Sequence, residues 1–397
     1  MTSQETIRDL ITAQARRFER WVFLEYGDQQ YSYGAVDERT DRAATGLNRL
    51  GLRPGDKIGL LMANRPEFVF FLFGAPKIGA ATVPVDTGLS HDDMLFVLEH
   101  SGVSAVVTES RFRELRDHAH GVRHWIEVDN PSFAAPPFQN LTRGPILGFW
   151  PDLDAEELAL LSYTKSGSGM WKAVALSHKN LVSNCLQVLQ PFRINETDRF
   201  LCATPLSSVA ASVLLILVPW AAGGGCVLRE AYSPRILRDI AECRATVIAG
   251  MPLLYETLAC SPEFGDCDLS SLRLAICSSG PVGERVLVAF EEQHDALIVE
   301  GYGPLEATCL CCANPYTGVR KPGSLGIPLP GVDCRIIDPQ GRQASAGDEG
   351  EIVVRGPNVM KGYFRDEEAS ARALRDGWLH TGDVGCTDSD GYYYLRS

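Results

Sequence analysis

Residues 160–181 read LLSYTKSGSGMWKAVALSHKNL, and this stretch gives the clearest indication of the fold. An apolar run leads into a Ser/Gly-rich loop that contains a lysine, and a helical pattern begins near His178. Small residues let backbone N–H groups approach anionic oxygens, and a lysine adds a point charge. The spacing is not G-x-x-x-x-G-K-[ST], so this is not a Walker loop. A phosphate site and an ordinary strand-to-helix turn both remain open at this point.

On both sides of this loop, short apolar runs alternate with helical patterns, which is typical of βαβ units. We expect strands at 57–62, 81–85, 104–107, 200–203 and 246–249, and helices at 37–50, 65–73, 91–100, 180–189 and 211–222. The first 21 residues indicate an amphipathic helix. From about residue 321, Gly and Pro separate short alternating strands such as 333–337 and 351–354. The pattern predicts an α/β fold of two mostly parallel sheets covered by helices, plus a smaller β-rich subdomain.

Composition excludes some classes of function. The formal net charge is −13 and no run of Lys or Arg occurs, so we expect no nucleic-acid partner. The longest apolar stretch, 209–222, contains Pro219 and is shorter than the roughly 20 residues that span a bilayer, so we expect no membrane segment.

The 12 cysteines are scattered from Cys185 to Cys386. The one cluster, Cys309, Cys311 and Cys312, has no matching ligand set downstream. We therefore expect buried, reduced cysteines and a cytoplasmic protein rather than disulfides or zinc.

Taken together, several ordered motifs resemble the adenylate-forming enzymes, which include acyl-CoA synthetases, peptide-synthetase adenylation domains and luciferases. The loop resembles their signature Y-[ST]-S-G-[ST]-T-G-x-P-K-G-V, followed by L-S-H-x-N-L. The other matching stretches are YSYGAVDERTDRAATGLNRLGLRPGDKIGLLMANRPEFV (31–69), KIGAATVPVDTGLS (77–90), EGYGPLEAT (300–308), GSLGIPLPGVDCRIIDPQGR (323–342), GEIVVRGPNVMKGYF (350–364) and DGWLHTGDVG (376–385). The resemblance covers essentially the whole chain.

The resemblance implies that an acyl-adenylate is made from a carboxylic acid and ATP with magnesium, and that CoA then attacks the adenylate. It assigns the ribose hydroxyls to Asp383 beside Thr381, and it makes Glu306 and Lys172 catalytic, with Glu306 also a magnesium ligand. The remaining nucleotide-binding positions that it implies are Ser279, Gly280, Pro281, Gly301, Tyr302, Gly303 and Leu305. The chain is then the large N-terminal domain, with α/β portions at about 1–175 and 176–320 and a β-rich portion at 321–397. It ends in GYYYLRS, so we expect the small C-terminal domain to be missing after the hinge.

The departures from the family pattern lie mainly at phosphate contacts. Lys165-Ser166-Gly167 replaces Ser-Gly-Thr, Trp171 replaces proline, Ala173 replaces glycine and Leu305 replaces a hydroxyl residue. The degenerate phosphate loop comprises Thr164, Lys165, Ser166, Gly167, Ser168, Gly169 and Trp171. Leucine cannot donate a hydrogen bond, and loss of a glycine restricts the backbone. Three hypotheses stay open. The protein could form thioesters from acyl-adenylate supplied by a separate adenylating enzyme, it could be an ordinary two-step ligase, or it could be a non-catalytic binder.

The acyl pocket is expected at PLSSVAAS, residues 205–212. Family members that activate amino acids carry an aspartate where this chain has Ser207 or Ser208, so an amino-acid substrate is disfavoured. Ala210 and Ala211 leave room for side chains of the substrate. A bulky, mostly apolar carboxylic acid, or its adenylate, is the predicted substrate.

Overall fold

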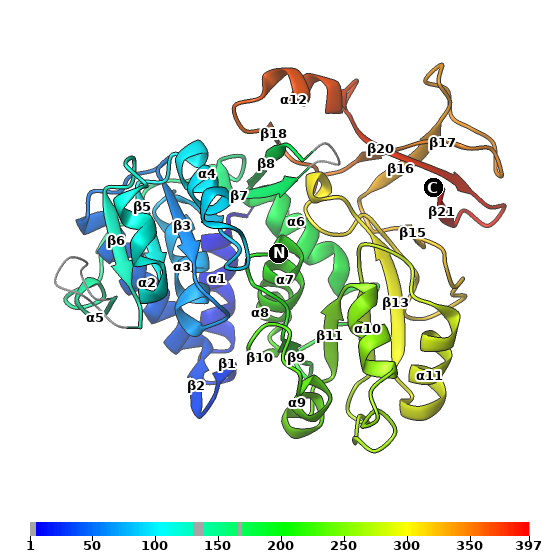
Figure 1. Ribbon diagram of the computed structural model, residues 1–397, viewed down its shortest axis with the longest axis horizontal. Coiled ribbons are helices and arrows are strands. Elements are labelled where there is room, and N and C mark those ends of the chain that lie inside the picture. The colour runs from blue at the N-terminus through cyan, green and yellow to red at the C-terminus, as the bar shows by residue number, and fades with distance from the viewer. Residues whose placement is uncertain (1–4, 130–137, 166–168, 397) are drawn as a thin grey trace.

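The computed structural model describes residues 5–129, 138–165 and 169–396. Three sheets organise the chain (Figure 1). The first sheet has seven strands in the order β18-β8-β7-β4-β3-β5-β6, the second has nine in the order β15-β14-β13-β12-β11-β9-β10-β1-β2, and the third is a small sheet built around β16-β17-β20-β19, with β21 paired to β20.

The first sheet is parallel from β7 through β4, β3 and β5 to β6, and the hairpin partner β8 and the short β18 run antiparallel. Its strands are β3 (Lys57–Leu61), β4 (Ala81–Pro84), β5 (Ala105–Thr108), β6 (His124–Glu127), β7 (Leu158–Lys165), β8 (Trp171–Ser177) and β18 (Gly362–Tyr363). The helices along this part of the chain are α1 (Ile7–Arg17), α2 (Tyr33–Arg49), α3 (Pro66–Lys77), α4 (His91–Ser101), η1 (Ser110–Asp117) and α5 (Phe138–Leu141).

The second sheet is parallel from β1 through β10, β9, β11 and β12 to β13, and antiparallel at both edges. Its strands are β1 (Val22–Tyr26), β2 (Gln29–Ser32), β9 (Arg199–Cys202), β10 (Gly225–Leu228), β11 (Val247–Gly250), β12 (Leu274–Cys277), β13 (Leu297–Tyr302), β14 (Cys312–Ala313) and β15 (Ile327–Pro328). The helices along this part of the chain are α6 (His178–Leu189), α7 (Val209–Ala211), the π-helix η2 (Ser212–Leu217), α8 (Val218–Ala222), α9 (Ile236–Cys243), α10 (Pro252–Ala259), α11 (Glu284–His294) and η3 (Leu305–Ala307).

The third sheet is antiparallel throughout and lies at the C-terminal end of the described chain, in orange and red in Figure 1. It comprises β16 (Asp333–Ile337), β17 (Gly350–Arg355), β19 (Leu374–Arg375), β20 (Trp378–Thr387) and β21 (Tyr393–Arg396), and α12 (Glu367–Ala373) precedes β19. The predicted fold class of two mostly parallel, helix-covered sheets and a smaller β-rich subdomain is therefore confirmed.

One large core joins the two big sheets. Its buried side chains come from α1, α3, α6, η2 and α8 as well as from strands of both sheets. The charged Lys77 of α3 is almost fully buried, and its ammonium lies 2.5 Å from Asp37 and 2.6 Å from Asp41, both on α2. Such pairing is what permits a lysine inside an apolar core.

Two elements differ from the sequence prediction. Residues 171–177 form strand β8, which pairs with β7 in a hairpin, where the sequence pattern suggested only a loop before the helix at His178. The helix expected at 211–222 is present, but Ser212–Leu217 within it form a π-helix, which hydrophobic periodicity does not distinguish from an α-helix. The predicted division at about 175 and 320 stays a prediction. Strands β1 and β2 pair into the second sheet, and β18 pairs into the first.

Candidate active site

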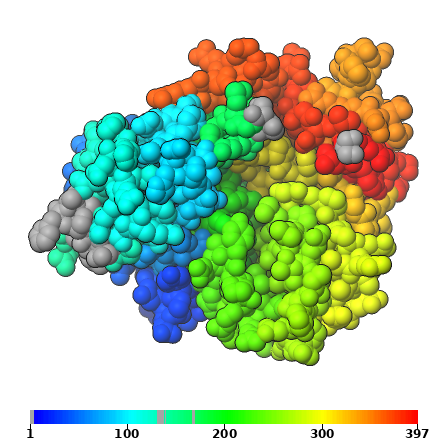
Figure 2. Space-filling model, in the orientation of Figure 1, coloured from blue at the N-terminus to red at the C-terminus, as the bar shows by residue number. Residues whose placement is uncertain are grey.

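A cavity of about 490 Å³ lies between the first and second sheets. It opens where the cyan part of the chain faces the green and yellow parts (Figure 2). The cavity brings together residues predicted for three different roles, from the acyl pocket, the phosphate loop and the nucleotide site: Ser207, Ser208, Ala210, Ala211, Thr164, Lys165, Trp171, Ser279, Gly303 and Leu305. The predicted acyl pocket and both ends of the predicted phosphate loop therefore face the same space.

The acyl wall of this cavity is held in place by a buried asparagine. The Asn64 amide donates to the carbonyl oxygens of Thr204 (2.9 Å) and Arg229 (3.1 Å) and accepts from the Leu206 N–H (2.9 Å). The Ser212 hydroxyl, at the start of the π-helix, donates to the Leu206 carbonyl at 2.7 Å. These bonds fix the turn that carries Ser207 and Ser208 into the cavity.

Sequence reasoning missed several lining residues. Asp86 and Leu89 follow β4, and Tyr232 and Met251 follow β10 and β11, so none lies in the stretch that suggested the pocket. Asp86 brings a carboxylate to a cavity that Ser207 and Ser208 alone leave without one, and its Oδ1 accepts from the Gly88 N–H at 2.8 Å. Their shared position after parallel strands was the available signal, because ligands commonly bind at the carboxyl ends of such strands, and strands of both large sheets end at this cavity.

The predicted ribose carboxylate lies beside the predicted adenine strand. The Tyr302 hydroxyl at the end of β13 donates to Asp383 Oδ2 on β20 at 2.5 Å. Burial raises the pKa of Tyr302, and its bond to Asp383 raises it further, so the phenol stays a donor. The Thr381 hydroxyl accepts from the Asp383 N–H (3.1 Å) and donates to the Ile352 carbonyl (2.7 Å). The side chains of the second and third sheets thus meet at this carboxylate.

Glu306 and Lys172, the predicted catalytic pair, both contact Tyr363, which lies in the matching stretch 350–364 but was not a predicted site residue. The Tyr363 hydroxyl on β18 donates to Glu306 Oε1 at 2.7 Å, and Lys172 Nζ on β8 lies 4.7 Å from the centre of the Tyr363 ring. Burial raises the pKa of Tyr363, and the Glu306 carboxylate raises it further. A cation over an aromatic face is favoured electrostatically.

Two non-glycine residues that line the cavity have positive φ angles. Ser279 has φ +71° and Thr308 has φ +72°, in the left-handed region that non-glycine residues rarely adopt. A Cβ on Gly303 would lie 2.1 Å from the Cys309 carbonyl oxygen, so this position requires glycine. Behind Gly280 and Pro281, the Val282 N–H donates to Glu300 Oε1 at 2.9 Å, which holds that turn against β13. Gly301 is buried within β13 itself.

Lys165 and Trp171, at the two ends of the predicted phosphate loop, both contact Asp93 on α4. Lys165 Nζ lies 2.8 Å from Asp93 Oδ2, and Trp171 Nε1 donates to Asp93 Oδ1 at 2.9 Å. Thr164 pairs with Lys172 across the β7–β8 hairpin, and Ala173 is buried opposite Tyr163. Gly169 has φ +79°. The predicted loop residues Ser166, Gly167 and Ser168 lie outside the described residues.

Comparison with known proteins establishes the family. The model for the AMP-binding enzymes matches residues 11–364 of this chain. The chain belongs to the AMP-binding enzyme family. A feruloyl-CoA synthase from an Amycolatopsis species is 33% identical over 389 residues, covering 96% of this chain and 76% of that protein.

Solved structures agree with this placement in the AMP-binding enzyme family. ATP-bound MatB from Rhodopseudomonas palustris is 27% identical with a TM-score of 0.89, covering 98% of this chain and 78% of that one. The anthranilate CoA ligase AuaEII in complex with anthranoyl-AMP has a TM-score of 0.94 over 100% of this chain and 78% of that one. Its identity of 23% shows the shared fold alone. In the part of this AMP-binding enzyme that the structure describes, no helix has the length and apolarity needed to cross a membrane.

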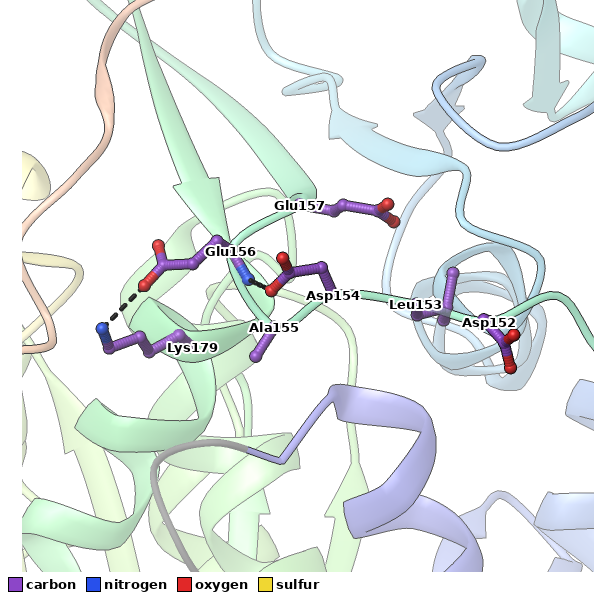
Figure 3. Close-up of a pocket in the computed structure, with 7 residues that line it drawn as sticks. All are labelled: Asp152, Leu153, Asp154, Ala155, Glu156, Glu157 and Lys179. Atoms are coloured by element: carbon purple, nitrogen blue, oxygen red, sulfur yellow. Dashed lines mark hydrogen bonds and ion pairs between the residues drawn. The ribbon is translucent and has the colours of Figure 1, made fainter.

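A second depression in this AMP-binding enzyme is lined mainly by acidic residues (Figure 3). It measures about 710 Å³ and is lined by Asp152, Leu153, Asp154, Ala155, Glu156, Glu157 and Lys179. Lys179 pairs with Glu156 at 2.6 Å, and this bond lowers the pKa of Glu156. None of the predicted site residues lines it. We interpret it as a solvated acidic surface.

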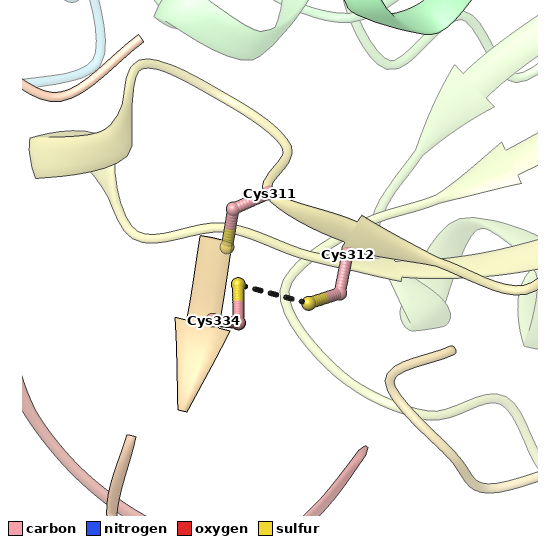
Figure 4. A group of neighbouring side chains, drawn as sticks. All are labelled: Cys311, Cys312 and Cys334. Atoms are coloured by element: carbon pink, nitrogen blue, oxygen red, sulfur yellow. Dashed lines mark hydrogen bonds between the residues drawn. The ribbon is translucent and has the colours of Figure 1, made fainter. Parts of the chain in front are cut away.

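Cys334, which sequence spacing did not connect to the cysteine cluster, joins Cys311 and Cys312 in a buried group (Figure 4). Their sulfur atoms lie within 4.8 Å of one another, and Cys312 Sγ lies 3.5 Å from Cys334 Sγ. The group has three members among the described residues, whereas structural zinc takes four ligands. Burial raises the pKa of the Cys311 thiol, which donates to the Tyr302 carbonyl at 3.3 Å. We interpret these thiols as the packing that joins β14 to β16 behind Tyr302.

Proposed function

We propose that this chain is the adenylate-binding part of an acyl-CoA ligase that acts on a bulky, mostly apolar carboxylic acid. The observation that carries the proposal is the chain segment at the end of β13. Tyr302 reaches the predicted ribose carboxylate Asp383, Gly303 and Leu305 line the cavity, and Glu306 reaches Tyr363 beside Lys172. One short segment thus touches the predicted nucleotide, acyl and phosphate regions, which an enzyme that handles an acyl-adenylate requires.

The cavity supports an aromatic or similarly bulky acid. Its volume of about 490 Å³ is large enough for a ring-bearing acid and lies within the usual range for small-molecule sites. The Amycolatopsis relative is named for a feruloyl product, and the structural neighbour was solved with anthranoyl-AMP. Leu214 and Leu215 from the π-helix supply apolar wall, and the small side chains of Ala210 and Ala211 leave the space open.

The chemistry assigns separate tasks to these residues. A carboxylate can accept both ribose hydroxyls, so Asp383 would anchor the AMP moiety after Tyr302 turns from it. Magnesium is commonly held by one or two carboxylates together with substrate phosphates, and Glu306 fits that donor set. The ion would offset charge on the phosphates. In the second half-reaction the CoA sulfur attacks the acyl carbon, the C–O bond to AMP breaks, and AMP leaves.

We further propose that adenylation is the weaker half-reaction. Adenylation requires the carboxylate to attack the α-phosphorus while pyrophosphate leaves, and donors that contact this leaving group lower the barrier. Leu305 offers no hydroxyl, and the Lys165 ammonium is paired with Asp93. Release of AMP involves no pyrophosphate, so thioester formation should be spared. A separate adenylating enzyme would then supply the acyl-adenylate.

The first prediction tests this asymmetry between the two half-reactions. Feruloyl-AMP or anthranoyl-AMP plus CoA should give thioester readily, whereas the free acid with ATP and magnesium should give it about 100-fold or more slowly, since each donor lost is typically worth about 3–4 kcal/mol. Product is measured by liquid chromatography, and adenylation separately by exchange of labelled pyrophosphate into ATP. The matched variant Leu305→Thr, which restores a hydroxyl at this position, should raise exchange by a larger factor than it changes thioester formation from the adenylate.

Each remaining hypothesis gives a different result in these assays. Exchange at an ordinary rate with the unmodified protein would identify a two-step ligase and contradict weak adenylation. Absence of thioester from every adenylate in a panel of aromatic and aliphatic acids would contradict the ligase itself and favour a non-catalytic binder.

A further inference from the structure

Asp93 is the shared partner of the two loop ends. It lies in the first turn of α4, where Ser90 caps the helix by accepting from the Asp93 N–H at 3.2 Å. The Asp93 carboxylate accepts from Lys165, from the Trp171 indole and, at 3.0 Å, from the Ser90 hydroxyl. These hydrogen bonds, that from Lys165 foremost, hold the pKa of Asp93 well below its usual value, at about 2.

The contact extends along one face of α4. Lys165 and Trp171 are direct partners across the β7–β8 hairpin, and Lys165 Nζ lies 4.7 Å from the centre of the Trp171 ring. The same indole stacks on Phe96, with ring centres 6.4 Å apart and planes inclined by 17°. Residues three apart on a helix share a face, so Asp93 and Phe96 both contact the end of the hairpin.

This arrangement has an electrostatic consequence for the loop. An ammonium paired with a carboxylate at 2.8 Å contributes little net positive charge to an approaching polyphosphate. Lys165 and Trp171 are also two of the positions that depart from the family pattern. At both positions the residue in this chain has a hydrogen-bond donor, and both donors bond to Asp93.

We propose that Asp93 is a positioning residue that withholds Lys165 from the β- and γ-phosphates of ATP and so lowers the affinity for ATP relative to AMP. The inference rests on the proposed function for the location of the phosphates. Asp93 competes with the phosphates for one lysine, while the AMP moiety, held at Asp383, does not depend on that competition.

The test is the binding of ATP and of AMP to the 397-residue chain by isothermal titration calorimetry. In Asp93→Asn, the amide oxygen still accepts from Trp171 while the charge that holds Lys165 is removed. ATP affinity should rise about five- to tenfold at low salt and less at high salt, with AMP affinity within about twofold. Asp92→Asn is the matched control, because Asp92 is an exposed neighbour on the same helical turn, and it should change neither affinity.

The double variant Asp93→Asn/Lys165→Met separates this role from a general structural one. If Lys165 carries the effect, the gain in ATP affinity should disappear while the thermal midpoint stays near that of Asp93→Asn. Unchanged or weaker ATP binding in Asp93→Asn, or an equal gain in Asp92→Asn, would overturn the inference. Pyrophosphate exchange at an ordinary rate by the unmodified protein would contradict weak adenylation but not the role of Asp93. The role of Asp93 is tested by the ratio of ATP affinities of Asp93→Asn and the parent, which is measured without turnover.

Discussion

Asp383 is the predicted ribose-binding carboxylate, and its hydrogen bonds within the protein already orient it. Its carboxylate accepts one hydrogen bond from Tyr302 at 2.5 Å, and its own N–H is fixed by Thr381, so it is already oriented toward the end of β13. Ribose hydroxyls would replace the phenol as its donors. The expected contribution to binding therefore comes from charged hydrogen bonds, which are worth about 1.5–3 kcal/mol each.

Replacing Asp383 by asparagine should raise the Kd for AMP by about 10- to 100-fold, because the amide accepts more weakly than the carboxylate. Calorimetric titration of the 397-residue chain measures it. Asp376→Asn is the control, since Asp376 is an exposed residue between β19 and β20 of the same sheet and should leave the Kd unchanged. Equal Kd values for Asp383→Asn and the parent would remove Asp383 from the ribose site.

At the scale of the elements, the glycine with the least room for a side chain among the described residues is Gly326, beside the β14–β15 pair. Gly326 precedes β15 with φ +79°, and a Cβ there would lie 1.9 Å from the Ala313 carbonyl carbon. Gly326 also bridges to Tyr393 of β21, so the second and third sheets meet at this glycine. Backbone atoms cannot move aside as a flexible side chain can.

Gly326→Ala should lower the free energy of unfolding by more than about 4 kcal/mol, which is exceptional for a single substitution. Gly391→Ala is the matched control. Gly391 has φ +84° but nothing within 4 Å of its Cβ position, so it should lose only the conformational cost of about 1–2 kcal/mol. Chemical denaturation of both variants gives the comparison, and similar losses would contradict a steric role for Gly326.

At the scale of the whole molecule, His178 ties α1 to α6, which follows β8 of the first sheet. It is the first residue of α6, it is completely buried, and its Nδ1 accepts from the Ile7 N–H of α1 at 3.3 Å. Burial lowers the pKa of His178 to about 4, with Arg8 lowering it and Asp9 opposing. The unfolded chain binds a proton at this imidazole near pH 6.5, whereas the folded chain does not until about pH 4. Stability from this group is therefore present above pH 6.5 and is lost as pH falls toward 4.

Between pH 7 and pH 5 the parent should lose about 2 kcal/mol more unfolding free energy than His178→Gln. Denaturant unfolding of both proteins at the two pH values measures this. His91→Gln is the control, because His91 is likewise the first residue of a helix but is exposed, and it should keep the parental pH dependence. An identical pH dependence in His178→Gln and the parent would mean that the imidazole is not held neutral.

Local sequence determined most of the helices and strands, because hydrophobic periodicity and capping act over a few residues. The predicted strand at 333–337 is β16 with the same bounds, and Ser177 and Asn180 form a capping box at the predicted start of α6. Ordered motifs determined the family. The pairing of Lys165 and Trp171 into a hairpin was not predicted, since a Ser/Gly-rich loop carries no periodicity and hairpin pairing depends on residues across the turn.

The tertiary structure alone determined which of these motifs meet. Asp93 and Lys165 are 72 residues apart, Glu306 and Tyr363 are 57 apart, and Cys312 and Cys334 are 22 apart. No local pattern encodes such contacts, because they depend on how the sheets are ordered and packed. Sequence could therefore indicate that Lys165 and Trp171 depart from the phosphate-loop pattern, but only the packing of α4 against the hairpin showed that both side chains have Asp93 as their partner.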